Sequence, residues 1–202
     1  MQSYSLLTYS RLPINPKSRT VGSESHPASW SEEQLLAQCK LTFSRASGPG
    51  GQNRNKVETS VQIEFIPAGI IAAASECRTQ NENRKVAVQR LRCKLAVELR
   101  PTPVTVASDS NSTSPANEQV GSKTWQEYCR NGRIDIAESN SDWPSVLAEI
   151  IGLLSVCAWS IGQVATILGT TSSQLVKLLK RVPPAFILLN RERKARGQRP
   201  LE

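Results

Sequence analysis

The sequence predicts an α+β protein in which a small mixed domain is followed by a linker and an all-α helical bundle. Residues 30–100 alternate between strand and helix patterns, as expected for a three- to four-stranded sheet packed by one long helix. Residues 101–123 are rich in Pro, Ser, Thr and Asn, which is typical of a flexible linker. Residues 124–202 carry apolar side chains at helical spacing. Residues 1–29 are rich in Ser and Pro, and we expect a disordered N-terminal arm there.

Local patterns place the elements of the first domain. We predict a short helix over 31–39, strands over 40–44, 59–66 and 70–74, and a long helix from Thr79 to about Leu99. Ser31 and Gln34 have the spacing of a capping box. Alternation places the apolar side chains of the central strand on one face. In the long helix, four cations are expected to line the face opposite the apolar one: Arg84, Arg90, Arg92 and Lys94.

The second domain is predicted to contain three or four helices and to end in a basic segment. Pro144 marks a helix start, and apolar residues follow it at helical spacing. Residues 161–180 resemble a helix-turn-helix, with Gly169 in the turn. Such a unit serves either as a DNA reader or as a plain or RNA-contacting bundle. Its second helix offers only Lys177 and Lys180 as cations, which favours the bundle.

The charge balance points to a polyanionic partner. Lys and Arg number 25 against 17 Asp and Glu, which gives a net charge of +8 and a pI near 9.5. The basic excess lies in residues 1–100 and 141–202, while the segment between them is acidic. Each of the two predicted domains therefore has its own basic surface.

Composition also excludes several site classes. His26 is the only histidine, so zinc sites built on several histidines are excluded and any Ser-His-Asp site must use His26. The five cysteines form no C-x-x-C pair, and we expect neither a metal nor a cofactor. Scattered single cysteines indicate a reducing compartment. No run of 18 apolar residues occurs, so no membrane partner is expected.

The loop between the first two predicted strands is the strongest functional candidate. Gly48, Gly50 and Gly51 lack side chains, and no acid occurs between Arg45 and Glu58. Such a cationic loop can bring its backbone close to RNA. The alternative is an ordinary glycine-rich hairpin loop, and physical reasoning alone leaves both interpretations open.

Three motifs resemble class I peptide chain release factors. The sequence RASGPGGQNRNKVETSV at 45–61 is similar to the family's GGQ signature, IPAGI at 66–70 to its I-P-T-G-I turn, and RTQ-x-x-NR at 78–84 to its R-S-Q-x-x-N-R helix start. The departures are Thr79, where serine is usual, and Arg54, where a small apolar residue is usual. Neither departure touches the GGQ tripeptide.

The resemblance implies hydrolysis of peptidyl-tRNA on the ribosome. The catalytic residues would be Gly50, Gly51 and Gln52. The Gln52 backbone N–H would stabilise charge at the reacting centre, and its side chain would position water. The two glycines would permit the required backbone shape. Because the family's glutamine is commonly N5-methylated, a glutamine N5-methyltransferase is an implied partner.

The resemblance and the basic patches also imply contacts to ribosomal RNA. The expected RNA-binding residues are Arg45, Ser47, Asn53, Arg54, Asn55, Lys56, Gln80, Arg84, Arg191, Arg193, Lys194, Arg196 and Arg199. For Gln80 and Arg84 the alternative is that they cap and pin the long helix. For the basic end, 191–199, the alternative is a solvated helix end. We expect a monomer whose partners are large-subunit RNA and peptidyl-tRNA.

Codon-independent ribosome rescue is the expected role. Full release factors carry a codon-reading domain before the GGQ loop, with a P-x-T or S-P-F tripeptide. Here only 44 residues precede Arg45, and Pro103-Val104-Thr105 follows the loop, within the linker. The alternative function is a non-catalytic RNA- or DNA-binding regulator that uses the C-terminal bundle. We expect a cytoplasmic location; residues 1–23 also resemble an organellar transit peptide, which makes a mitochondrial or other organellar matrix the alternative.

Overall fold

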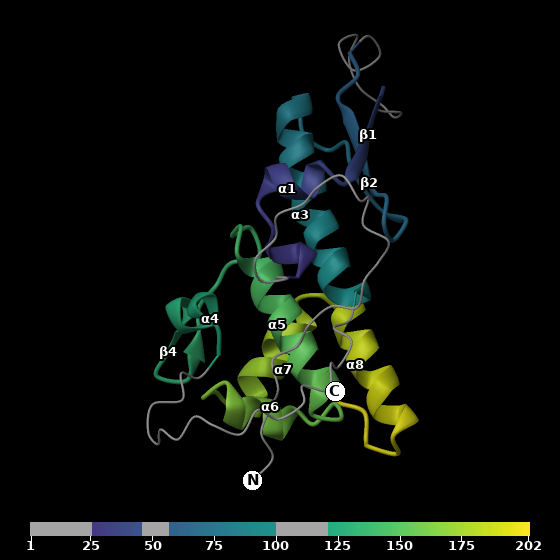
Figure 1. Ribbon diagram of the computed structural model, residues 1–202. Helices are drawn as coiled ribbons and strands as arrows, with labels where there is room; N and C mark the ends of the chain where they lie inside the picture. Colours follow the sequence, from purple (N-terminus) through teal and green to yellow (C-terminus); the bar gives the residue numbers. More distant parts are fainter. Residues whose placement is uncertain (1–25, 46–56, 100–120) are drawn as a thin grey trace, which may run out of the picture.

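The computed structural model describes residues 26–45, 57–99 and 121–202 (Figure 1). In chain order the elements are η1 (Pro27–Ser29), α1 (Glu32–Leu36), β1 (Cys39–Ser44), β2 (Ser60–Phe65), β3 (Ile70–Ala74), α3 (Gln80–Glu98), α4 (Lys123–Tyr128), β4 (Cys129–Arg130), β5 (Arg133–Ile134), α5 (Trp143–Val156), α6 (Ile161–Ile167), α7 (Ser172–Lys180) and α8 (Pro183–Ala195). The predicted α+β class is confirmed, and the predicted strands agree with β1–β3 to within one residue at each end.

The three-stranded sheet is antiparallel, with β2 between β1 and β3. Val61, Ile63 and Phe65 are buried on one face, as their alternation predicts. They pack with apolar side chains of α3, which covers this face of the sheet. The capping box predicted at Ser31 is present at the start of α1, and Thr79 caps α3 as predicted, in a capping box with Glu82.

Helix α3 is shared by two hydrophobic cores. One side of it, including Leu91 and Leu95, belongs to the core under the sheet. Near its C-terminus, Ala96 and Val97 belong to a second core formed mainly by α5–α8. Figure 1 shows α3, in teal, between the sheet and α5. The mixed domain and the helical bundle are therefore packed together along this helix.

The bundle forms through the residues that its helical patterns place inside. Four apolar residues of α5 are at most 1% exposed: Leu147, Ile150, Ile151 and Leu154. Helices α6 and α7 are joined at Gly169, whose φ of +62° suits a residue without a side chain. Trp125, Trp143 and Trp159 are buried among these helices. The predicted helix-turn-helix arrangement is thus present in the second domain.

The prediction that 124–202 are helical is wrong for one short segment. Strands β4 and β5 form an antiparallel hairpin in which Cys129 pairs with Ile134. Its turn is Asn131-Gly132, with φ values of 50° and 74°. Asn-Gly is the sequence that best adopts two successive positive φ values, so this dipeptide is the signal that helical periodicity obscured.

The predicted boundaries of the arm and the linker also need correction. Residues 26–29, which the sequence predicts to be part of the disordered arm, belong to the fold. The His26 side chain caps η1, and Ala28 is buried in the core of the bundle. Ser122 caps α4 and donates through its N–H and Oγ to the Glu149 carboxylate, at 2.7 and 2.6 Å. The remainder of the predicted arm and linker, 1–25 and 101–120, lies outside the described residues.

His26 ties the start of the described chain to the end of α3. Its Nδ1 accepts from the Ala28 N–H at 2.9 Å, which leaves the proton on Nε2 to donate to the Leu99 carbonyl at 3.2 Å. Burial lowers the pKa of His26 from 6.5 to about 4, and the Leu99 hydrogen bond opposes this only in part. The folded protein therefore holds His26 neutral at pH values where the unfolded chain is protonated.

We predict that acid destabilises the fold through His26. Between pH 6.5 and 4 the unfolded chain binds a proton that the folded state excludes, so the unfolding free energy falls as pH falls, by about 3 kcal/mol at pH 4. His26→Asn keeps an N-cap acceptor without a titrating group and should lose less stability in this window. Urea titrations of both proteins from pH 7 to 4 measure the difference; parallel curves would contradict the prediction.

Candidate functional site

The GGQ loop connects β1 to β2 at one end of the sheet. Ser44 pairs with Ser60, so the chain leaves and re-enters the sheet at the same end. Arg45 is exposed at the start of the loop. Several predicted site residues lie in 46–56, outside the described residues: Ser47, Gly50, Gly51, Gln52, Asn53, Arg54, Asn55 and Lys56. The described part of the site is therefore the base of this loop and what holds it.

The first turn of α3 holds the returning side of the loop. Gln80 Nε2 donates to the Glu58 carbonyl at 3.1 Å, and Asn83 Nδ2 donates to the Thr59 carbonyl at 2.8 Å. Asn83 Nδ2 also donates to the Cys77 carbonyl at 3.0 Å, and Asn83 Oδ1 accepts from the Cys77 N–H at 2.8 Å. Two carbonyls just after the loop are thus fixed to one helix turn.

Asn83 is the positioning residue that the site prediction omitted. It is 0% exposed, and its amide joins the loop base, the β3–α3 connection and α3. A buried amide with both ends bonded is costly to replace, because any truncation leaves backbone groups without partners. Its signal in the sequence is the N of the RTQ-x-x-NR motif at 78–84.

The contacts of Gln80 and Arg84 agree with the interpretation in which these residues pin the helix. Gln80 bonds the Glu58 carbonyl, and Arg84 Nη2 pairs with the Glu32 carboxylate of α1 at 3.4 Å. The Arg84 pair is about half exposed, so it contributes little stability. It links α1 to the helix turn that holds the loop base.

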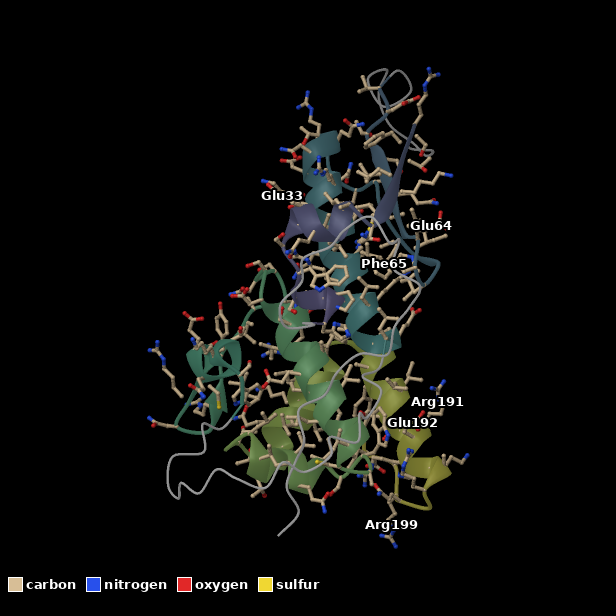
Figure 2. All side chains as sticks on the ribbon, in the orientation of Figure 1. Glu33, Glu64, Phe65, Arg191, Glu192 and Arg199 are labelled. Carbon is tan, nitrogen blue, oxygen red and sulfur yellow. The ribbon has the colours of Figure 1, made fainter. Side chains whose placement is uncertain are left out.

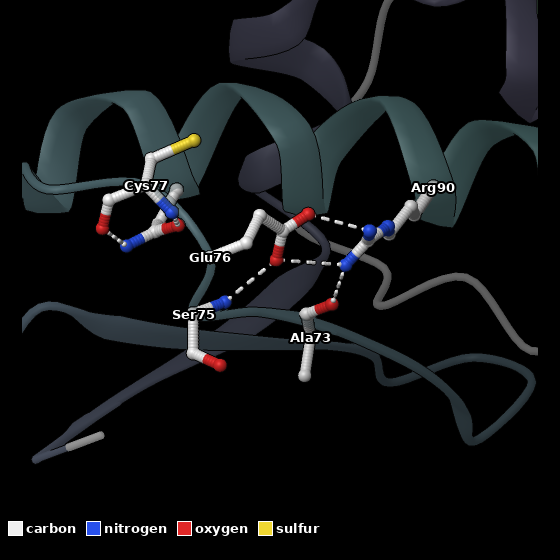
Figure 3. A network of polar contacts seen from close by, with 6 residues as sticks. Ala73, Ser75, Glu76, Cys77 and Arg90 are labelled. Atoms are coloured by element: carbon white, nitrogen blue, oxygen red, sulfur yellow. Dashed lines mark hydrogen bonds and ion pairs between the residues drawn. The ribbon is translucent and has the colours of Figure 1, made fainter. Parts of the chain in front are cut away.

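Two of the four cations expected on the polar face of α3 bond backbone carbonyls of the edge strand β3. Figure 3 shows the contacts of one of them, Arg90. Arg90 Nη1 donates to the Ala73 carbonyl at 2.9 Å, and Lys94 Nζ donates to the Ile71 carbonyl at 2.6 Å. Arg90 also pairs with the Glu76 carboxylate at 2.5 Å. The Ser75 N–H, chiefly, and Arg90 lower the pKa of Glu76. These contacts hold the edge strand β3 against α3.

The cations of the basic end divide into two groups. Arg193 donates to the carbonyls of Trp159 and Arg199, at 3.1 and 3.0 Å, and Arg196 bonds Glu192 and lies over the Trp159 ring. These two side chains stabilise the end of α8. Arg191, Lys194 and Arg199 are exposed, although Arg191 also approaches the Glu192 carboxylate at 3.4 Å. Figure 2 shows Arg199 near the end of the molecule away from the sheet residues Glu64 and Phe65, and Arg191 higher up on α8.

Burial makes the thiols of Cys39 and Cys93 poor nucleophiles. Burial raises the pKa of both Cys39 and Cys93 to about 11, so both are protonated at neutral pH. Among the described residues, no group of three His, Cys, Asp or Glu side chains could hold a metal ion. In the same part of the chain, no helix is long and apolar enough to cross a membrane.

Comparison with known proteins places the loop and its supports in one family. A model of the RF-1 domain matches residues 35–139, which is just over half of the chain. Chloroplastic peptide chain release factor PrfB1 of Arabidopsis thaliana is 34% identical over 110 residues, 53% of this chain and 24% of that protein. Peptide chain release factor 1 of Chlorobaculum tepidum is 53% identical over 64 residues, 32% and 17% of the two chains.

A third relative, peptide chain release factor 1 of Acidiphilium cryptum, is 35% identical over 94 residues, 46% of this chain and 25% of that protein. The chain thus spans a quarter or less of the length of these relatives. The match ends four residues before α5, so α5–α8 lie beyond it. With the matched region containing the GGQ loop and the α3 turn that holds its base, this chain belongs to the class I peptide chain release factor family.

Proposed function

We propose that this chain is a ribosome-dependent peptidyl-tRNA hydrolase. Water adds to the ester carbonyl, the ester C–O bond breaks, and the peptide leaves as a carboxylic acid while the tRNA recovers its terminal hydroxyl. In this proposal the Gln52 N–H stabilises the developing oxyanion and the Gln52 side chain positions the water. Gly50 and Gly51 let the backbone adopt the shape that aims this N–H.

The observation that carries the proposal is the fixed base of the loop. A loop that contributes geometry to an RNA-built catalytic centre must enter it in a constant orientation, because small displacements of reacting groups are costly. Gln80 and Asn83 hold the carbonyls of Glu58 and Thr59, two and three residues after Lys56. An intact GGQ sequence on such a support favours catalysis over the alternative of a non-catalytic nucleic-acid-binding regulator.

We further propose that release is codon-independent and rescues stalled ribosomes. The bundle beyond the matched domain supports this, because the exposed cations Arg191, Lys194 and Arg199 offer an anchor on RNA that needs no codon. Near the loop the proposed RNA contacts are Arg45, Ser47, Asn53, Arg54, Asn55 and Lys56. Gln80, Arg84, Arg193 and Arg196 have structural partners that RNA binding would have to keep or replace.

The remaining parts of the proposal concern partners and place. Gln52 is proposed as the substrate of a glutamine N5-methyltransferase, and the chain as a monomer. We propose that it acts on ribosomes of the cytoplasm. The chloroplastic relative supports the alternative that it acts in an organelle.

Gly51→Ala should abolish release without weakening ribosome binding. The added methyl group would obstruct the close approach of backbone to RNA, and we expect the release rate to fall roughly 100-fold or more. Gly162→Ala is the matched control, because a methyl group at this α6 position meets nothing within 4 Å. Single-turnover release and ribosome pelleting measure the two effects. Release by Gly51→Ala at the rate of the Gly162→Ala control would overturn the catalytic proposal.

Gln80→Ala should lower the maximal release rate several-fold while leaving stability unchanged. The substitution frees the Glu58 carbonyl from α3, and Gln80 is exposed, so little folding energy is lost. Asn81→Ala, exposed one residue further along α3, is the control. Release titrations separate the two roles of Gln80. An unchanged maximal rate with a higher half-saturating concentration would assign Gln80 to RNA contact instead.

Messages with and without a stop codon test codon independence. We expect equal release from ribosomes stalled at the end of a truncated message and from ribosomes stalled at a sense codon or a stop codon. Release confined to stop codons would show that the activity depends on codon reading and would reject the rescue proposal. Release of labelled peptide from purified stalled complexes is the measurement.

A further inference from the structure

An open groove of about 790 Å³ lies between the β4–β5 hairpin and α7. Its walls carry four exposed cations: Arg130 and Arg133 of the hairpin, Lys177 of α7, and Arg181 at the end of α7. Two acids, Glu127 and Asp135, also line it. The lining is therefore net positive, and none of these cations lies in the GGQ loop or at the basic end.

The hairpin is fixed at both ends of α7. Thr170 Oγ1, just before α7, donates to the Gly132 carbonyl in the hairpin turn at 2.7 Å. Arg181 Nη1, just after α7, donates to the Ile136 carbonyl at 2.8 Å. Trp125 Nε1 joins α4 to the Leu168 carbonyl at 3.0 Å. The groove is thus built before any ligand binds, which lowers the entropy cost of binding.

Three of the four groove cations have no side-chain partner within the described residues. Within 26–45, 57–99 and 121–202, Arg130, Arg133 and Lys177 make no ion pair and no side-chain hydrogen bond. Arg181 differs, since it bonds the Ile136 carbonyl and lies over the Trp143 ring at 5.9 Å. Three unpaired cations on a fixed frame leave their charge directed toward solvent.

We propose that this groove binds the phosphate backbone of an RNA helix. Arginine presents a planar fork that matches phosphate oxygens, and a groove open to solvent admits a continuous strand. The charges lie on the hairpin and along α7, while the start of α7 carries the uncharged Ser172 and Ser173, which favours backbone contact over base reading. The choice of RNA over DNA rests on the proposed ribosomal function.

The groove variant Arg133→Gln/Lys177→Gln tests this in the full chain. The control Lys40→Gln/Lys85→Gln removes the same charge from two exposed lysines of the mixed domain, neither of which has a hydrogen bond or ion pair among the described residues. Fluorescence anisotropy with a 16-base-pair RNA hairpin, at several salt concentrations, should show affinity roughly tenfold lower for the groove variant alone. The slope of the logarithm of its RNA affinity against the logarithm of salt concentration should be shallower than that of the wild type, corresponding to roughly one to two fewer released ions.

Equal affinities of the groove variant and the wild type would overturn the proposal, as would an equal loss in the control. Tighter binding of the matching DNA duplex than of the RNA would assign the groove to DNA. Release titrations separate this site from the catalytic loop. The groove variant should raise the half-saturating concentration of factor with the maximal rate kept, whereas Gly51→Ala should lower the maximal rate even if the groove proposal is wrong.

Discussion

The structure depends on one helix being buried along two sides. Helix α3 has 19 residues, about 28 Å of length, and packs against the sheet along one side and against α5 along another. Its first turn holds the loop base through Gln80 and Asn83, and its last turns complete the bundle core through Ala96 and Val97. Because a packed helix is stiff, the loop base and the bundle keep a constant relation. The proposed catalytic loop and the proposed RNA anchor need such a connection.

Polar side chains on α3 fasten it to its neighbours by satisfying backbone groups. Asn83 bonds the Thr59 and Cys77 carbonyls, while Arg90 and Lys94 bond carbonyls at the outer edge of β3. Arg92 Nη2 reaches the Trp30 carbonyl at 2.7 Å. An open sheet edge invites pairing with another chain, so the two cations on β3 also protect the domain from association. The basic character of this helix is therefore partly structural.

The same distinction applies to the charge of the whole chain. Three arginines each donate to a backbone carbonyl within the fold: Arg181, Arg193 and Arg196. Three other cations make no ion pair in the described ranges: Arg130, Arg133 and Lys177. A net charge of +8 predicts a polyanionic partner but does not say which cations face it. Among the described residues, three cations without an ion pair line the hairpin groove together, which a count along the sequence does not show.

The sequence by itself determined most of the helices and strands, and the family. Alternation in β2, the capping box at Ser31, the helix start at Thr79 and the GGQ motif are local patterns, and local patterns can be read without knowing the fold. It missed the hairpin, because two strands of two residues each carry almost no periodicity. Only the tertiary structure decided that α3 serves two cores, that Asn83 holds the loop base, and that Arg133 and Lys177 line the same groove. Each of these joins residues distant in sequence, and such contacts depend on packing.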